Sequence, residues 1–264
     1  MPIITISLDA FTDGQTLAEQ VAAILRYRCV GREALVGASQ RYGMPEAKFT
    51  EILESDPHWW ERWQEGLRLY RIVLQAAMCE IAQSGDLVYH GHAAQELFPG
   101  IRHVLKVRLT APRRYRVEQV RAQQALSDAA ALRYIERVDR ARTRRLQAIF
   151  GADWRDASRY DLVLNIAQMS LETAAHLVVE AAQRKEYQPA ADSDQAFQDL
   201  TITANVQAAL IMSAETRSLN LGVSVRAQYG QVRVFGILAR PELQQEVIRV
   251  IKGVRGVTHV IADF

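Results

Sequence analysis

Short apolar runs alternate with stretches of helical periodicity through the first two thirds of this chain, and this alternation constrains the fold more than any other feature. Residues 3–8 form a run rich in β-branched side chains, and residues 87–89, 103–110 and 160–165 form three more. Helical connections of this kind join parallel strands. The pattern therefore predicts an α/β fold, a doubly wound parallel sheet with helices on both faces. In such a sheet a ligand binds beyond the carboxyl ends of the strands.

The pattern changes after residues 184–194, a polar stretch that contains a proline and has no periodicity. Residues 195–264 then predict a helix, two strands joined by a turn, a helix that begins at Pro241 and a last strand. We therefore expect a first domain over 1–183, a linker over 184–194 and a small α+β domain over 195–264. The element order of that small domain is α-β-β-α-β.

Composition excludes several classes of protein. Apolar residues make up 49% of the 264 residues, which is enough for a packed core, and no run approaches the ~18–20 residues that span a bilayer. The net charge of +2 gives no sign of a surface built to wrap nucleic acid. No secretory signal is visible, and Cys29 and Cys79 have neither metal nor redox spacing. We therefore expect a cytoplasmic protein with reduced thiols.

Arginine dominates the basic residues and gathers in one segment. Of the 32 basic residues only four are lysines, and residues 108–145 hold 11 arginines against four acidic residues. Ser127, within this segment, predicts the start of a helix, and Gly151, just beyond the segment, predicts its end. A guanidinium offers a fixed fork of donors that suits phosphate or carboxylate. An anion-binding surface and a solvated helical face with internal ion pairs are both consistent with the pattern.

The loop after the first strand lacks the residues of a phosphate-binding loop. Such a loop needs glycines that let the backbone wrap phosphate oxygens, a lysine, and a serine or threonine for magnesium. Residues 7–16 are SLDAFTDGQT, with one glycine and no lysine. Asp9 and Asp13 place carboxylates near a helix N-terminus, where an anion would otherwise bind. We interpret Asp13 as a helix cap rather than as a ligand-binding residue.

Two further sequence patterns give only weak evidence for a binding site. Residues 33–54 have the spacing of a helix-turn-helix, but the second helix would carry three glutamates against one lysine and would repel phosphates. We therefore expect no DNA partner. His90 and His92 could face one side of a strand, but no third ligand is nearby in sequence, so we expect no metal site. A general-base role for His92 stays an alternative.

Four segments of the first domain carry a family resemblance. They are PIITIS, LVYHGHAAQELFPGIRHVLKVRLTAPRRYRV, AALRYIERVDRARTRR and FGADWRDASRYDLVLN. Together they resemble the cytidylate-kinase-like family, which is related to the bacterial nucleoside monophosphate kinases. The resemblance implies a P-loop kinase-like fold. In an active member it implies transfer of the γ-phosphoryl group of ATP, with magnesium, to CMP or dCMP.

Carried over position by position, the resemblance loses the phosphate cradle. The glycines of the family's loop fall on Leu8, Phe11 and Asp13, and its lysine falls on Gly14. The Gly-Arg-Asp that holds the acceptor nucleotide falls on residues 91–93, where only the glycine is kept. The candidates that the resemblance leaves for nucleotide binding are Gly14, Thr16, Gly91 and His92.

The resemblance keeps the cations of the lid region. Arg113 and Arg116 follow the third strand, and Asp139 and Arg142 match the family's Asp-x-x-Arg. Phosphoryl transfer depends on positioning and on cations spread over the phosphates. The resemblance therefore makes Arg113, Arg116, Asp139 and Arg142 the catalytic candidates, with ATP and magnesium as cofactors only if the protein is active.

The last 70 residues carry a second resemblance. The segments DLTITANVQAAL, VRAQYGQVRVFGIL and KGVRGVTHVIADF resemble a BON module. Such modules are associated with phospholipid or protein binding, so the resemblance implies a partner of one of these kinds. A homo-oligomer is a further possibility.

Three functions are compatible with these observations. The first is a cytidylate-kinase-like protein with a degenerate ATP loop, a nucleotide-related sensor or scaffold joined to a BON interaction module. The second is an active nucleoside monophosphate kinase in which Arg113, Arg116 or Arg142 supplies the missing charge. The third is a binding module whose arginine-rich surface takes an acidic protein or a nucleic acid, with an affinity that falls steeply with salt.

Overall fold

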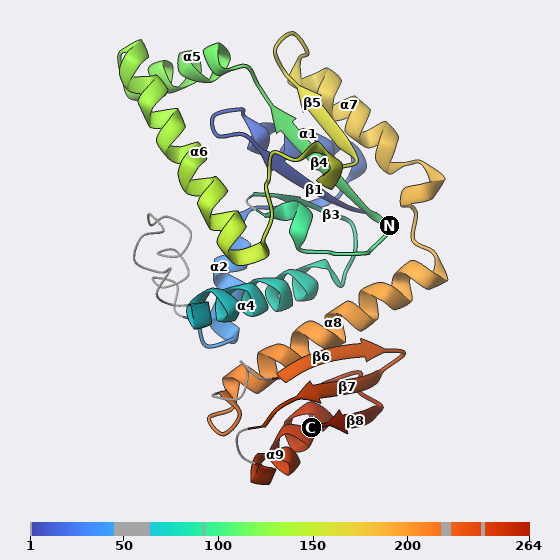
Figure 1. Ribbon diagram of the computed structural model, residues 1–264. Helices are drawn as coiled ribbons and strands as arrows, with labels where there is room; N and C mark the ends of the chain where they lie inside the picture. Colours follow the sequence, from blue (N-terminus) through green and yellow to red (C-terminus); the bar gives the residue numbers. More distant parts are fainter. Residues whose placement is uncertain (1, 45–63, 92, 218–222, 239–240) are drawn as a thin grey trace. The chain divides into compact units, whose positions relative to one another are not determined.

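A computed structural model describes residues 2–44, 64–91, 93–217, 223–238 and 241–264, and the chain forms two compact units (Figure 1). The described part of the first unit is residues 2–34 and 84–189. The second unit combines residues 190–264 with residues 35–44 and 64–83. Two segments from within the predicted first domain therefore pack with the C-terminal region.

Five parallel strands form the sheet of the first unit, in the order β2-β3-β1-β4-β5. The predicted α/β class with a parallel sheet is confirmed. Four strands match the predicted runs, and β2 was not predicted because two of its three residues are exposed. The strands are β1 (Ile3–Leu8), β2 (Arg28–Val30), β3 (Leu87–His90), β4 (Val104–Thr110) and β5 (Leu162–Asn165).

Helices α1 and α7 pack against each other and against the sheet to form the main core of this unit. Ile6 of β1, Leu17 of α1 and Val178 of α7 are fully buried there. A separate pair of helices, α5 and α6, encloses a smaller cluster around Val120 and Ile135. The helices are α1 (Gly14–Leu25), α5 (Arg113–Gln124), α6 (Asp128–Phe150) and α7 (Leu171–Ala182).

The second unit contains a three-stranded sheet with the predicted element order α-β-β-α-β. Strand β7 pairs antiparallel with β6 and parallel with β8. The inward valines of the hairpin, among them Val225 and Val232, pack with the apolar faces of the two helices. The elements are α8 (Ala191–Met212), β6 (Val223–Gln228), β7 (Gln231–Gly236), α9 (Gln244–Lys252) and β8 (His259–Asp263).

The first helix of this region begins at Ala191, within the residues that we predicted as a linker. Its start is fixed because the Ala190 amide donates to Ser193 Oγ at 3.0 Å. A polar N-terminal turn of a helix has no apolar periodicity, which explains why the pattern missed it. The two remaining helices of the unit are α2 (Arg32–Arg41), which begins in the first unit, and α4 (Gln64–Ala82).

Two predictions fall outside the described residues. These are the second helix of the helix-turn-helix pattern and the role of His92. Among the helices that are described, none is long and apolar enough to cross a bilayer.

Candidate functional site

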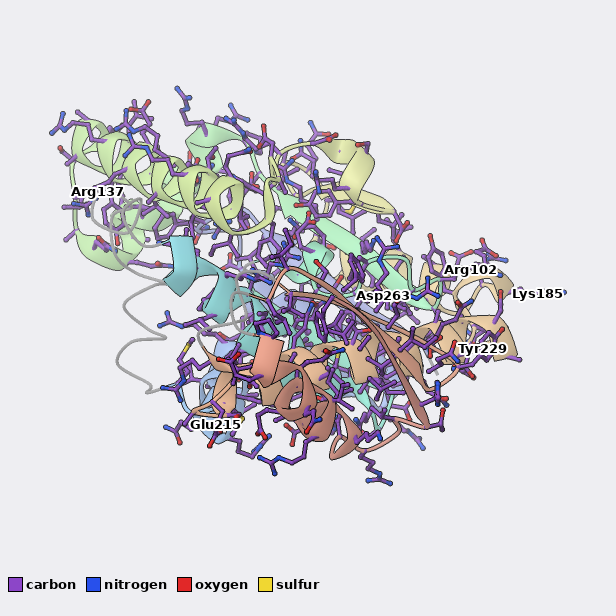
Figure 2. All side chains as sticks on the ribbon, turned by 60° about the horizontal axis from the view of Figure 1, so that its bottom comes forward. Arg102, Arg137, Lys185, Glu215, Tyr229 and Asp263 are labelled. Carbon is purple, nitrogen blue, oxygen red and sulfur yellow. The ribbon has the colours of Figure 1, made fainter. Side chains whose placement is uncertain are left out.

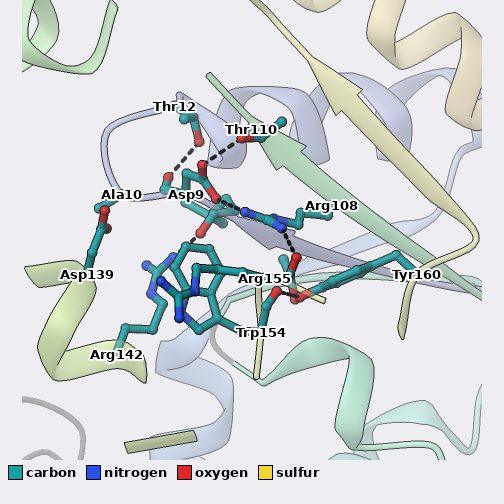
Figure 3. A network of polar contacts seen from close by, with 12 residues as sticks. Asp9, Ala10, Thr12, Arg108, Thr110, Asp139, Arg142, Trp154, Arg155 and Tyr160 are labelled. Carbon is teal, nitrogen blue, oxygen red and sulfur yellow. Dashed lines mark hydrogen bonds and ion pairs between the residues drawn. The ribbon is translucent and has the colours of Figure 1, made fainter. Parts of the chain in front are cut away.

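A buried polar network lies where β1 and β4 end (Figure 3). Asp9 follows β1 and is only 5% exposed. Its carboxylate accepts hydrogen bonds from Arg108 Nη2 at 3.1 Å and from Thr110 Oγ1 at 2.7 Å. Residues two apart on a strand face the same side, so β4 presents both donors to the end of its neighbour. The charge of Asp9 is therefore neutralised inside the protein.

Aromatic rings surround the Arg108 guanidinium. Its carbon lies 4.8 Å from the centre of a Trp154 ring and 6.0 Å from that of Tyr160. Arg108 Nη1 donates to the carbonyl of Arg155 at 2.9 Å, and the Tyr160 hydroxyl donates to the carbonyl of Trp154 at 2.7 Å. Burial raises the pKa of Tyr160 to about 12. The segment around Trp154 thus forms a wall that holds a cation in a largely dry environment.

Arg116 connects the first loop to both helices of the α5–α6 pair. Its Nε donates to the carbonyl of Ala10 at 2.8 Å. Its two Nη atoms donate to the Asp139 carboxylate at 2.9 and 2.7 Å, which is a bidentate pair. The predicted lid residues Arg116 and Asp139 are therefore partners of each other, and together they fix the loop against α6.

Arg142 lies one helical turn beyond Asp139 and also contacts the loop. Its Nη1 donates to the carbonyl of Leu8, and its guanidinium lies 5.0 Å from the centre of a Trp154 ring. Removal from water lowers the pKa of Arg142 to about 10, although Asp139 and Asp9 oppose the shift. The Nε atoms of Arg142 and Arg108 are buried, and no described residue forms a hydrogen bond with them. Both guanidinia therefore retain donor capacity.

The first loop keeps a backbone conformation that favours glycine at two positions where it has none. Phe11 has a φ of 65° and Asp13 a φ of 51°, both in the left-handed region. These are two of the positions that matched glycines of the family's loop. The backbone therefore keeps left-handed turns there although the glycines are absent.

The prediction that Asp13 caps the first helix is wrong. Asp13 stands at the capping position, but its side chain makes no capping hydrogen bond. A capping side chain needs an extended backbone, whereas Asp13 is left-handed. Its carboxylate instead accepts a hydrogen bond from the Tyr115 hydroxyl at 3.3 Å.

Gly14, the residue that matches the family's lysine, is in close contact with Leu8. A Cβ atom at Gly14 would lie 2.8 Å from Leu8 Cβ and 2.9 Å from Leu8 Cδ2. Contacts this short are not tolerated between well-packed carbons. Leu8 stands where the family has a glycine, and Gly14 stands where the family has a lysine. The large side chain of Leu8 therefore occupies the space beside residue 14, which has no side chain.

The other candidates lie apart from this network. Arg113 is 70% exposed and makes only a 3.9 Å ion pair with Glu136. Thr16 is exposed on α1. Gly91 donates its amide to the carbonyl of Ile6 at 3.1 Å, and a Cβ there would lie 2.7 Å from the Tyr89 hydroxyl, which indicates a packing role. Three or more metal-ligating side chains gather nowhere in the described part of the chain.

Sequence reasoning did not assign Arg108, Thr110 or Trp154 to the site. A signal for the first two was present, because an arginine inside an otherwise apolar strand requires a buried partner. The neighbouring strand offers Asp9 at its end. For Trp154 there was no such signal, since its place beside Arg108 depends on how the loop after α6 returns to the sheet.

The first loop follows β1, the central strand of the sheet, and Arg116 and Arg142 donate hydrogen bonds to carbonyls at this loop. This arrangement defines a protein of the P-loop kinase-like class. Residues 3–168, more than half of the chain, match the Cytidylate kinase-like family, and the chain belongs to that family. The match ends before the second unit's C-terminal sheet begins.

Individual relatives are distant. A cytidylate kinase of Methanopyrus kandleri is 26% identical over 152 residues, 54% of this chain and 72% of that protein. One of Pyrobaculum calidifontis is 25% identical over 181 residues, 68% and 92% of the two chains. The crystal structure of an uncharacterized protein from Eubacterium ventriosum matches with a TM-score of 0.53 at 15% identity, covering 69% of this chain and 97% of that one. At this identity the structural match supports the fold alone.

Proposed function

We propose that this protein is a nucleotide-kinase-like sensor or scaffold that does not bind Mg-ATP in the way of an active kinase. The observation that carries the proposal is the contact between Leu8 and Gly14. It leaves no room for a side chain at the position of the missing lysine. The first loop therefore lacks both the cation and the space that a P-loop lysine needs.

Electrostatics supports the same conclusion. The family implies ATP and magnesium as cofactors, but the residues of this loop do not fit them. Asp13 adds a carboxylate at the N-terminus of α1, where the helix dipole would otherwise favour an anion. Arg116 and Arg142 hydrogen-bond to loop carbonyls, so part of their donor capacity is already used. A triphosphate would meet repulsion at the place where an active kinase attracts it.

A smaller anionic ligand is compatible with the buried cations. The guanidinia of Arg108 and Arg142 lie 4.8 and 5.0 Å from the centre of a Trp154 ring, and the Nε atom of each has no hydrogen-bond partner among the described residues. One phosphate group of a nucleoside monophosphate would satisfy such donors. This supports a sensor of a monophosphate rather than a phosphotransferase.

Calorimetric titration of the full-length protein with Mg-ATP, CMP and dCMP tests the proposal. We expect no micromolar affinity for Mg-ATP and no ADP in a coupled assay with CMP. Binding of CMP or dCMP alone would support the sensor. Micromolar ATP affinity together with phosphoryl transfer would overturn the proposal.

The second candidate is an active CMP- or dCMP-type kinase that uses lid arginines in place of the lysine. The observation in its favour is that Arg116 and Arg142 both reach the first loop. If it is correct, Arg142→Lys lowers turnover strongly while circular dichroism shows a folded protein, because a lysine cannot reproduce the planar guanidinium contacts. Arg113→Lys is the matched control, since Arg113 is exposed outside the network. Equal turnover of the two variants would remove this candidate.

For the second unit we propose a BON-like module whose outer sheet face binds anionic phospholipid headgroups. Arg226 of β6 lies directly opposite Arg233 of β7, and of the two, within the described residues, Arg233 alone forms an ion pair, with Asp263 at 3.5 Å. Like charges in directly opposed positions destabilise a sheet. These residues line a hollow of about 640 Å³. An anionic group in the hollow would relieve the repulsion.

Vesicle flotation tests this part of the proposal. We expect the full-length protein to float with phosphatidylglycerol vesicles and not with phosphatidylcholine vesicles. Arg226→Gln/Arg233→Gln should abolish flotation. Lys252→Gln/Arg255→Gln removes the same charge from exposed positions outside the hollow and should preserve it. Absence of flotation, or equal loss in both variants, would contradict phospholipid binding and leave a protein partner for this module.

A further inference from the structure

The outer face of α6 is a stripe of arginines. Every exposed residue of this helix between residues 130 and 146 is an arginine, namely Arg133, Arg137, Arg140 and Arg144. Steps of four, three and four residues place them on one side of a helix. At 1.5 Å per residue the stripe is about 16 Å long. Figure 2 labels Arg137, whose side chain projects outward from α6.

The acidic residues of the helix do not neutralise the stripe. All three carboxylates of α6 form ion pairs with arginines of α5. These pairs are Asp128–Arg121 at 2.9 Å, Glu136–Arg113 at 3.9 Å and Asp139–Arg116 at 2.7 Å. Within the described residues, Arg133 and Arg140 have no ion-pair partner. The guanidinium of Arg137 lies 5.1 Å from the centre of the Tyr134 ring and keeps its charge exposed.

The chemistry of the stripe favours one kind of partner. Stable protein interfaces have a core that is poor in charge and rich in aromatic and apolar side chains. The stripe contains no exposed apolar residue over its length of about three turns. A single straight row of cations instead matches a single row of phosphates, whose binding is electrostatic and needs no apolar contact. The stripe thus fits a nucleic acid strand better than it fits an acidic protein.

We propose that the outer face of α6 binds the phosphate backbone of a single-stranded nucleic acid without reading its sequence. The proposal specifies the third function considered above and does not depend on the nucleotide site. It also differs from DNA reading by residues 33–54, because phosphate contacts position a strand but carry no sequence information.

Fluorescence anisotropy of a labelled 12-nucleotide oligouridylate with the full-length protein tests the proposal. Three phosphate contacts, one each from Arg133, Arg137 and Arg140, predict a slope of about −2 for log affinity against log salt, since each contact on a single strand contributes about −0.7. The affinity should then fall about 20-fold between 50 and 200 mM salt. An oligothymidylate of the same length should bind equally well.

Matched triple variants locate the site. Arg133→Gln/Arg137→Gln/Arg140→Gln should bring the salt slope close to zero and weaken binding at 50 mM salt at least tenfold. Arg184→Gln/Arg249→Gln/Arg255→Gln removes the same charge from exposed arginines on other elements and should retain the slope. Circular dichroism checks that both variants are folded.

Three results would overturn the proposal. They are no binding of the oligouridylate at 50 mM salt, equal loss in the two triple variants, and binding of polyglutamate but not of the oligonucleotide. The last result would assign the stripe to an acidic protein. None of these results would affect the calorimetric test of nucleotide binding, because that test probes the buried network and not the outer face.

Discussion

The arginines at the end of the sheet and those on the outer face of α6 have the same side chain in opposite surroundings. Arg140 and Arg142 are two residues apart on one helix, yet the first is exposed and the second is buried against the loop. A buried guanidinium requires partners, because a charge without them is costly to remove from water. An exposed one keeps its hydration and adds little to stability. Whether an arginine of α6 stabilises the fold or is accessible to a binding partner therefore depends on its position on the helix and not on its residue type.

The buried cations also close the first loop. Arg116 and Arg142 bind carbonyls of the loop itself, and Arg108 binds Asp9 next to it. In an active kinase such cations would be directed at a substrate phosphate. Here much of their hydrogen bonding is directed inward, so we expect the buried group to dominate folding and the exposed group to dominate association.

The largest effect should come from removing one buried charge. Arg108→Met leaves Asp9 buried without its ion-pair partner, and we expect a loss of about 3–5 kcal/mol in the free energy of unfolding, measured by urea denaturation. Arg137→Met on the exposed stripe should change that energy by less than about 0.5 kcal/mol. In Asp9→Asn/Arg108→Met the uncompensated charge is absent, so part of the loss should be recovered. Equal losses for Arg108→Met and Arg137→Met would erase the distinction between the two groups.

A smaller effect should come from the contact that closes the loop. Gly14→Ala introduces a Cβ 2.8 Å from Leu8 Cβ, and we expect a loss of about 1–3 kcal/mol from overpacking. In the Leu8→Gly background the same change should cost much less, because glycine removes the Cβ of residue 8 together with the rest of the side chain. A double-mutant cycle by urea denaturation measures this coupling. Additive effects would show that Leu8 does not occupy the space beside Gly14.

Much of the fold could be predicted from the sequence because its signals are local. The apolar runs of β1, β4 and β5 predicted the parallel sheet, and Ser127 and Gly151 predicted the ends of α6. The short β2 has no such run. The pairing of residues 64–83 with the C-terminal region was also not predictable, since it depends on contacts between segments far apart in the chain.

The candidate site was predicted in part for the same reason. Arg116, Asp139 and Arg142 were predicted through the family resemblance, and the structure brings them together at the first loop. Arg116 and Arg142 also donate to backbone carbonyls, and a pattern of side chains in the sequence cannot show such contacts. The contact between Leu8 and Gly14 likewise depends on how the loop closes, so the sequence could show the missing lysine but not the reason why no other side chain fits there.

The buried Tyr160 should make the free energy of unfolding depend modestly on pH in the alkaline range. Burial raises the pKa of Tyr160 from 10.0 to about 12, so between these values the folded protein holds a proton that the unfolded chain has lost. Stability from this group is complete below pH 10 and falls as pH rises through that window. In Tyr160→Phe the decline of unfolding free energy between pH 9 and 11 should be shallower, by up to about 1 kcal/mol. An equally steep or steeper decline in Tyr160→Phe would contradict the assignment.

The smallest change in the free energy of unfolding is expected at the start of α1, which has no side-chain cap, compared with the start of α7, which has one. Ser170 Oγ accepts the amide of Thr173 at 3.1 Å at the start of α7, so Ser170→Ala should cost about 1 kcal/mol in urea denaturation. Asp13 makes no such bond at the start of α1, and its left-handed backbone suits glycine. In Asp13→Gly the relief of this conformation opposes the loss of a charge near the helix dipole, so we expect a change within about 0.5 kcal/mol. A loss as large as that of Ser170→Ala would mean that Asp13 stabilises the helix start after all, and that the carboxylate at this end of the loop is kept for folding rather than left over from a lost phosphate site.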